Sequence, residues 1–245
     1  MFSPAGSDFL DPMAESCKNF NLEFSPEDAN VNVRAAHGKA YANDDIENTI
    51  AYALKKGCRR FDLFFMIGLG MQKREDVMQS LDYVDKLISR FGKRLYPFIS
   101  PYSAALDPGS LAFEDPDKYG YRVFYRTLEE HYRSFTKPSW KYFFNYETKY
   151  LTVDDIIDLT YISAEKLAEI KHKHNLISEE ALEYIKAEVK FSRNAMDLIN
   201  SENKCSISSL EKPLLATNEE MSWDAMKMKT RIVSLILRGG MRVFK

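Results

Sequence analysis

The sequence predicts an α/β fold with parallel strands, followed by a mainly helical region. Apolar runs that suit strands occur at 21–24, 60–69 and 94–101, and amphipathic helical patterns separate them. After residue 101 the pattern changes to a long irregular connection and then to helices. Strand and helix alternating at these lengths is typical of crossover units in a parallel sheet.

The first strand and the first helix have clear boundary signals. Pro26 is expected to stop the strand at 21–24, because a proline cannot donate to a central ladder. The following helix is predicted from Asn43, as a possible cap, to a stop at Gly57. Its apolar residues recur at helical spacing at Ile46, Ile50, Ala53 and Leu54.

The second strand, at 60–69, is almost continuously apolar, which predicts that both of its faces are covered in a parallel sheet. A second amphipathic helix follows at 73–91 and is expected to end near Gly92. The third strand, at 94–101, ends on a proline. Helices are also predicted at 122–134, 154–172, 179–200 and 223–237.

These patterns divide the chain into four segments. They are an N-terminal loop (1–20), the α/β region (21–101), a loop with a helical extension (102–200), and a linker with a terminal amphipathic helix (201–245). The connection after residue 101 is rich in Pro, Gly and Asp, which favour turns. Loops of this length in globular proteins are usually functional or disordered.

Composition excludes several classes of protein. The 34 Lys and Arg residues nearly balance 36 Asp and Glu residues, so the net charge of -2 argues against binding to nucleic acid. No apolar run approaches the ~20 residues that span a bilayer, and the N-terminus has no signal-peptide pattern. Three scattered cysteines suit reduced thiols. We therefore expect a cytoplasmic protein without a membrane partner.

Motif searches identify no catalytic residue. His172 and His174 are two residues apart, so on a helix they point to different sides and cannot share a metal ion. The sequence contains neither a G-x-S-x-G elbow nor a G-x-x-x-x-G-K-[ST] phosphate loop. It therefore lacks the motifs that an α/β-hydrolase and a P-loop enzyme require.

The ends of the predicted strands offer a candidate site. They read Ser25-Pro26-Glu27, Gly68-Leu69-Gly70 and Ser100-Pro101. Ligands of parallel α/β proteins gather at the carboxyl ends of strands, so a hydroxyl, a carboxylate and a bare backbone would meet at one edge. This trio suits an adenosine-like ligand. The alternative is that Ser-Pro and Gly-x-Gly serve only as turn residues.

The segment after the first strand is expected to return to the same edge. It contains Arg34, which could hold a carboxylate through a bidentate fork or form a helix-surface salt bridge, and then His37, Gly38 and Lys39. Further on, the aromatic tract PSWKYFFNYETK predicts packing in a core or lid, with part of it lining a substrate cavity. A stacking platform for single-stranded nucleic acid is disfavoured by the net charge.

The order of LEFSPED, VRAAHGKAYANDDIENTI and FDLFFMIGLGMQKREDV resembles the second half of the barrel of radical S-adenosylmethionine enzymes of the cobalamin-binding class. The later tracts, from SPYSAALDPGSLAFEDPDKYGY to PSWKYFFNYET, are similar to the C-terminal region of a branch of that class. The resemblance covers residues 20–175. It implies a partial, half TIM-like radical SAM barrel at 21–101, with the helical region after it.

The resemblance also implies site residues. Ser25 and Glu27 match the element near the ribose and amino-acid parts of S-adenosylmethionine, and Arg34 matches a position near the methionine carboxylate. Ile67 and Gly68 match the strand end that faces the adenine. Gly70 stands where the family usually has proline, so the details of that loop differ.

The cysteine triad C-x-x-x-C-x-x-C that holds the family's 4Fe-4S cluster does not occur in this sequence. The resemblance therefore implies the substrate-side, C-terminal part of a split or truncated enzyme. A separate N-terminal half-barrel chain would supply the cluster, and also cobalamin where it is used, and the substrate would be a small molecule. The alternatives are a non-catalytic remnant that acts as an interaction or ligand-binding module, and a small independent α/β ligand binder.

Overall fold

The computed structural model describes residues 1–103, 105–137 and 139–200. The chain divides into two units, Met1–Val189 and Lys190–Lys245. The predicted segment 21–101 lies in the first, whereas the predicted segment 102–200 extends from the first into the second. The predicted linker and helix within 201–245 lie outside the described residues. The first unit contains the sheets and the site.

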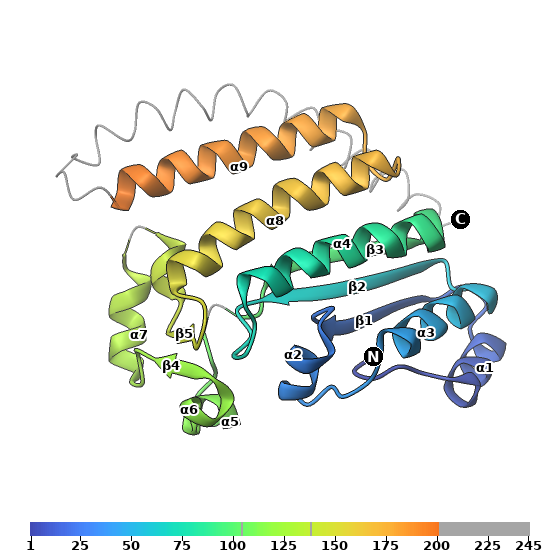
Figure 1. The fold of residues 1–245 in the computed structure, drawn as a ribbon, viewed down its shortest axis with the longest axis horizontal. Helices are drawn as coiled ribbons and strands as arrows, with labels where there is room; N and C mark the ends of the chain where they lie inside the picture. The colour runs from blue at the N-terminus through green and yellow to red at the C-terminus, as the bar shows by residue number, and fades with distance from the viewer. Residues whose placement is uncertain (104, 138, 201–245) are drawn as a thin grey trace, which may run out of the picture. The chain divides into compact units, whose positions relative to one another are not determined.

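A parallel sheet of three strands forms the centre of the first unit (Figure 1). It consists of β1 (Asn21–Glu27), β2 (Arg60–Ile67) and β3 (Leu95–Pro101), in the order β1-β2-β3. The connections contain α2 (Val31–Ala36), α3 (Asn43–Lys55), α4 (Arg74–Phe91) and the 3-10 turn Gly92–Arg94. The prediction of an α/β fold with parallel strands is confirmed at this level.

β1 is longer than predicted. It continues through Pro26 to Glu27, and its register with β2 shifts between Phe24 and Glu27. Phe24 pairs with Leu63, whereas Glu27 pairs with Phe65, so three steps along β1 match two along β2. A proline is tolerated in such an irregularity at the edge of a sheet, because it need not donate there. The prediction that Pro26 stops the strand is therefore wrong.

One face of the sheet carries the main core. Alternate strand residues, including Phe24, Phe61, Leu63 and Phe65, are almost fully buried there. The apolar stripes of α3 and α4 pack on this face, as the sequence predicts, through Ile46, Ile50, Leu81, Val84 and Leu87. Gly92 ends α4 with a positive φ of 70°, which confirms the expected stop.

The opposite face is partly covered, so the prediction that both faces of the second strand are covered holds fully for one face and in part for the other. Phe64 and Phe98 stack there with ring centroids 4.9 Å apart, and both remain half-buried. Lys171 lies over Tyr96 and Phe98, at 4.3 and 5.0 Å from the ring centroids. Burial lowers the pKa of Lys171 to about 8. No closed barrel is formed by the described strands.

The N-terminal segment is not only a loop. It contains α1 (Ser7–Ser16), which the sequence analysis missed. Leu10 of this helix is fully buried in the core, and Asp11 accepts a 2.8 Å hydrogen bond from the Tyr52 hydroxyl of α3. Tertiary contacts therefore hold a helix that contains Pro12 and has no side-chain N-cap.

Residues 102–150 form a small antiparallel unit beside the sheet. It contains the short helices α5 (Leu111–Glu114) and α6 (Pro116–Tyr119), then β4 (Tyr121–Val123) and α7 (Leu128–Phe135). The 3-10 turn Trp140–Phe143 and β5 (Tyr146–Thr148) follow, and β5 pairs with β4. The single helix predicted at 122–134 is therefore wrong, because β4 takes its first residues and Thr127 caps α7.

Two long helices complete the described chain. α8 (Val153–Lys173) and α9 (Glu179–Asn200) agree closely with the predictions. α8 runs alongside α4 and β3 (Figure 1), and Leu167 enters the main core. Among the helices that the structure describes, none combines the length and the apolar composition that crossing a bilayer requires.

Candidate functional site

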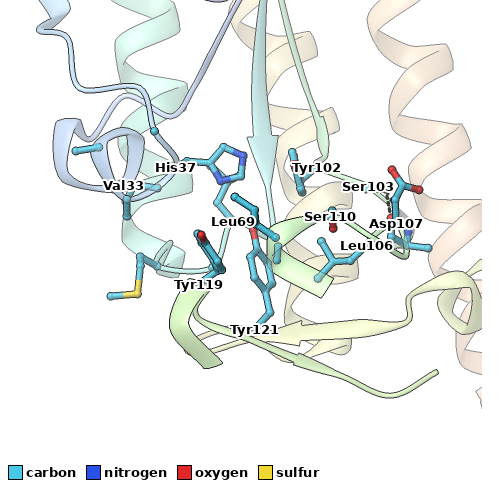
Figure 2. Close-up of a pocket in the computed structure, with 18 residues that line it drawn as sticks. Val33, His37, Leu69, Tyr102, Ser103, Leu106, Asp107, Ser110, Tyr119 and Tyr121 are labelled. Carbon is cyan, nitrogen blue, oxygen red and sulfur yellow. Dashed lines mark hydrogen bonds between the residues drawn. The ribbon is translucent and has the colours of Figure 1, made fainter. Parts of the chain in front are cut away.

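A cavity of about 510 Å³ lies at the carboxyl edge of the parallel sheet (Figure 2). The segments that follow all three strands line it, through Val33 and through residues 35–38, 69–71, 102–103 and 105–107. Residues 110–112, Tyr119 and Tyr121 of the small antiparallel unit form the remaining wall. The position agrees with the general rule that parallel sheets bind ligands beyond the carboxyl ends of their strands.

Most of the cavity wall is apolar. Its larger apolar side chains are Val33, Leu69, Met71, Leu106 and Leu111. The size and the lining are in the range of small-molecule sites in proteins. The backbone at Gly38 and Gly70 adds surface without side chains.

One end of the cavity carries an imidazole and two phenols. His37 and Tyr102 meet edge to face, with ring centroids 4.9 Å apart. In Figure 2 the Tyr121 hydroxyl points from the antiparallel wall toward the end of the cavity with Leu69 and His37. Burial lowers the pKa of His37 and raises the pKa of both tyrosines, so the imidazole is neutral and the phenols are protonated at neutral pH.

The loop between β3 and α5 is held in place by Asn145, which is fully buried. The Asn145 side chain accepts a 2.8 Å hydrogen bond from the Leu106 amide and donates one of 3.0 Å to the Leu106 carbonyl. These two bonds resemble a strand pairing. They fix the wall that carries Leu106 and Asp107.

Glu27 ends β1 with a positive φ of 73°, which is unusual for a residue with a side chain. Its carboxylate forms a 2.5 Å ion pair with Lys39, whose ammonium also donates to the Ser25 carbonyl. The second oxygen, Oε2, is buried and has no hydrogen-bond partner among the described residues. Glu27 does not line the cavity. Burial is the main cause of the raised pKa of Tyr102 and of Tyr121, and the negative charge of Glu27 acts in the same direction.

The side chains of Ser25 and Arg34 make hydrogen bonds to backbone carbonyls inside the protein. The Ser25 hydroxyl donates to the Phe64 carbonyl at 3.4 Å. Arg34 has no exposed surface, and its guanidinium donates to the carbonyls of Asp28, Ala29 and Tyr41. These contacts correspond neither to the predicted carboxylate fork nor to a helix-surface salt bridge. Arg34 stabilises the loop that brings His37 to the cavity.

Ile67 and Gly68 are also covered. Ile67 is fully buried, and its carbonyl accepts a 2.8 Å hydrogen bond from the Tyr102 amide. Gly68 has a φ of 93°, and a Cβ atom there would lie 3.1 Å from the Tyr146 hydroxyl and 3.2 Å from Ile156. In this structure β5 and α8 occupy the space beside Gly68, so a ligand at this backbone would have to displace them.

A buried polar network joins the loops after β1 and β2. Gln72 donates to the Asp28 carboxylate at 2.6 Å and accepts from the Gly68 amide at 2.8 Å. Asn30 donates to Asp76 at 2.7 Å, and its amide donates to Asp28 at 2.6 Å. Burial raises the pKa of Asp28 to about 6 against the opposing effect of these donors. The network positions two of the loops that line the cavity.

The described part of the chain contains no group of three His, Cys, Asp or Glu side chains that could hold a metal ion. The two described cysteines are free; Cys17 is exposed and Cys58 is buried. His172 pairs with Glu179 and His174 with Asp85. The residues described here therefore do not fit an iron-sulfur cluster.

No protein-family model and no curated protein matches this sequence. The resemblance to radical S-adenosylmethionine enzymes stays a prediction. None of the five residues that it implies, Ser25, Glu27, Arg34, Ile67 and Gly68, lines the cavity. They lie at the same edge of the sheet, but in the described conformation they do not form an open S-adenosylmethionine site.

Several lining residues had a signal in the sequence. His37 and Gly38 lie in the segment that was expected to return to this edge, and they do line the cavity. Tyr119 and Tyr121 belong to the aromatic-rich second half. By contrast, no described residue of PSWKYFFNYETK lines this cavity, while Phe144 and Tyr146 of the tract are buried in the core, as predicted. Tyr146 of this tract instead packs behind Tyr121, with ring centroids 5.4 Å apart.

Proposed function

We propose that this chain is a ligand-binding module that takes a small molecule into the cavity at the carboxyl edge of its sheet. The observation that carries the proposal is the convergence of loops from all three parallel strands on one cavity of about 510 Å³. The buried network of Asp28 and Gln72 and the clamp of Asn145 on Leu106 support it, because they hold these loops in defined positions.

The test uses the full chain labelled with ¹³C at its methionine methyl groups. Met71 lines the cavity, whereas Met13 and Met78 pack against the main core and serve as internal controls. A library of small planar heterocycles is screened by methyl chemical shifts. Binding in the cavity is expected to shift Met71 and leave Met13 and Met78 in place. A library in which no member shifts Met71 would contradict the proposal.

A matched pair of variants locates the binding site. Ala112→Trp places an indole in the cavity and is expected to abolish the Met71 shifts, because Ala112 lines it. Ala40→Trp adds the same group at an exposed position outside the lining and is expected to leave them unchanged. Equal responses of the two variants would place the ligand elsewhere.

A second candidate is the substrate-side portion of a cobalamin-binding-type radical S-adenosylmethionine enzyme. The observation that favours it is the sheet itself: three parallel strands have α3 and α4 on one face, while Phe64 and Phe98 on the other remain half-buried, as half of a barrel would. The 4Fe-4S cluster, and cobalamin if it is used, would come from a separate N-terminal chain. That chain would also have to remodel the edge at Glu27 and Gly68.

Mixing experiments test the second candidate. The chain alone is expected to bind S-adenosylmethionine weakly, because Arg34 and Gly68 are covered. The chain together with a half-barrel polypeptide that contains C-x-x-x-C-x-x-C is expected to bind iron and S-adenosylmethionine more tightly than either chain does by itself. Titration that shows no gain on mixing would rule this candidate out. The free described cysteines suit the cytoplasm, which we propose as the compartment for either function.

A further inference from the structure

The Tyr121 hydroxyl is a buried donor that faces the cavity without a partner. Tyr121 is 4% exposed and lines the cavity. The Gly70 amide lies close enough to the hydroxyl oxygen to oppose the effect of burial on its pKa, but an amide can only donate, and the hydroxyl proton has no acceptor among the described residues. An unpaired buried hydroxyl is unfavourable, so a ligand that accepts from it would recover the lost interaction.

The Tyr121 ring is fixed in this position. Tyr146 packs against it edge to face, and the Tyr146 hydroxyl donates to the Ser103 carbonyl at 3.0 Å. On its other side, the Tyr121 ring lies against Gly70, where a Cβ atom would be 3.0 Å from it. The hydroxyl is therefore a preorganised donor that does not have to be ordered when a ligand binds.

The charges around the cavity disfavour an anion. No lysine or arginine occurs among the described residues of the lining, and Asp107 is the one charged side chain there. Glu27 lies near the end with His37 and Tyr102, but its ion pair with Lys39 offsets its charge, and neither Glu27 nor Lys39 lines the cavity. A carboxylate or phosphate in this cavity would lose its hydration without gaining a positive partner.

We propose that the cavity selects an uncharged or cationic planar heterocycle, whose hydrogen-bond acceptor binds the Tyr121 hydroxyl, and rejects the anionic forms of the same molecule. This inference rests on the proposed ligand-binding function and adds its chemical class. Tyr121 is a specificity residue in this scheme, because its donor and the lack of a lysine or arginine among the described lining residues together decide which ligand enters.

Three pairs of probes that differ mainly in charge test the selection. They are adenosine and 5′-AMP, nicotinamide and nicotinate, and tryptamine and indole-3-acetate. Each is titrated into the full chain, with the Met71 methyl shift as the readout. The neutral or cationic member of a pair is expected to bind at least about tenfold more tightly than the anion, which corresponds to ~1.4 kcal/mol.

The variant Tyr121→Phe tests the donor. It removes one hydroxyl without changing the ring and is expected to weaken the binding of the neutral probes about tenfold. Its melting temperature is expected to be equal to or higher than that of the wild type, because an unpaired buried hydroxyl is lost. Tyr132→Phe is the matched control, since Tyr132 is exposed and lies outside the lining.

The outcomes separate the two proposals. Shifts of Met71 by neutral and anionic probes with equal affinity, or unchanged affinity in Tyr121→Phe, would overturn this inference and leave ligand binding in the cavity intact. Shifts of Met71 by other library members but by none of the six probes would have the same meaning. A complete lack of Met71 shifts across the library would overturn the proposed function, and this inference with it.

Discussion

Gly70 shows how a single residue serves the assembly of the cavity. A Cβ atom at this position would lie 1.9 Å from the Tyr119 carbonyl oxygen, which belongs to the backbone and cannot move aside cheaply. The chain of the antiparallel unit therefore crosses directly over the end of β2. Glycine is required for this close approach of two backbones, and the loop that it belongs to then lines the cavity.

The variant Gly70→Ala is expected to lower the free energy of unfolding by about 3 kcal/mol, because the backbone at 119–120 has to shift. Urea denaturation measures the effect. Gly6→Ala is the control: its Cβ would meet only the Asp8 carboxylate tip, at 3.1 Å, and is expected to cost less than about 1 kcal/mol. Equal costs at the two positions would show that the two backbones do not meet at Gly70.

The sequence contained part of this information. The run that ends in Gly68-Leu69-Gly70 correctly marked a strand end, and either turn chemistry or a ligand could explain its glycines. The structure adds a third reason, contact with Tyr146 and with the Tyr119 backbone. Such contacts join residues about 50 to 80 positions apart, so no local pattern predicts them. For the same reason the sequence could name Glu27 but could not show that Lys39 already binds it.

At the level of elements, predictions succeeded where the signal was local. The apolar stripes of α3, α4 and α8 and the apolar runs of β2 and β3 predicted the boundaries of these elements to within two residues. Predictions failed where an element forms because of contacts with residues that are distant in the sequence. β4 exists because it pairs with β5, 25 residues away, and α1 is held by Leu10 and by the Tyr52 hydroxyl.

The network between the loops after β1 and β2 should make stability depend on pH. Burial raises the pKa of Asp28 from 3.8 to about 6. In the unfolded chain Asp28 loses its proton near pH 4, whereas the folded chain keeps it until about pH 6. The favourable contribution of the protonated form is therefore complete below pH 4 and disappears as the pH rises through 6. The loss is on the order of 3 kcal/mol.

The variant Asp28→Asn cannot titrate, so the difference between its free energy of unfolding and that of the wild type should change between pH 4 and 7. As the pH rises, the free energy of unfolding of the variant is expected to increase relative to that of the wild type. The amide also loses one acceptor for Gln72, but this cost is the same at every pH. Asp155→Asn is the control: hydrogen bonds from Thr152 lower the pKa of Asp155, so its contribution to stability changes mainly below pH 4, and the difference from the wild type should stay nearly constant between pH 4 and 7. If the free energies of unfolding of wild type and Asp28→Asn changed in parallel with pH, the raised pKa of Asp28 would be contradicted.

At the scale of the whole molecule, the described structure resembles a self-sufficient domain more than an open half. The core draws buried residues from α1, all three strands, α3, α4 and α8. The chain also contacts both outer strands, since the Met1 amine donates to the Glu23 carbonyl of β1 and α8 packs on β3.

The full chain without any partner is therefore expected to show a native near-UV circular dichroism signal and protected amides in β1, β2 and β3. In urea both signals should disappear together in one transition, since one core joins these strands to the helices. A chain that needs a second half-barrel would instead bind a hydrophobic dye without denaturant, lack the near-UV signal and exchange its strand amides quickly. Because Tyr102, Tyr121 and Tyr146 lie at the cavity or directly behind it, the same near-UV measurement also reports whether the site is formed before any ligand is added.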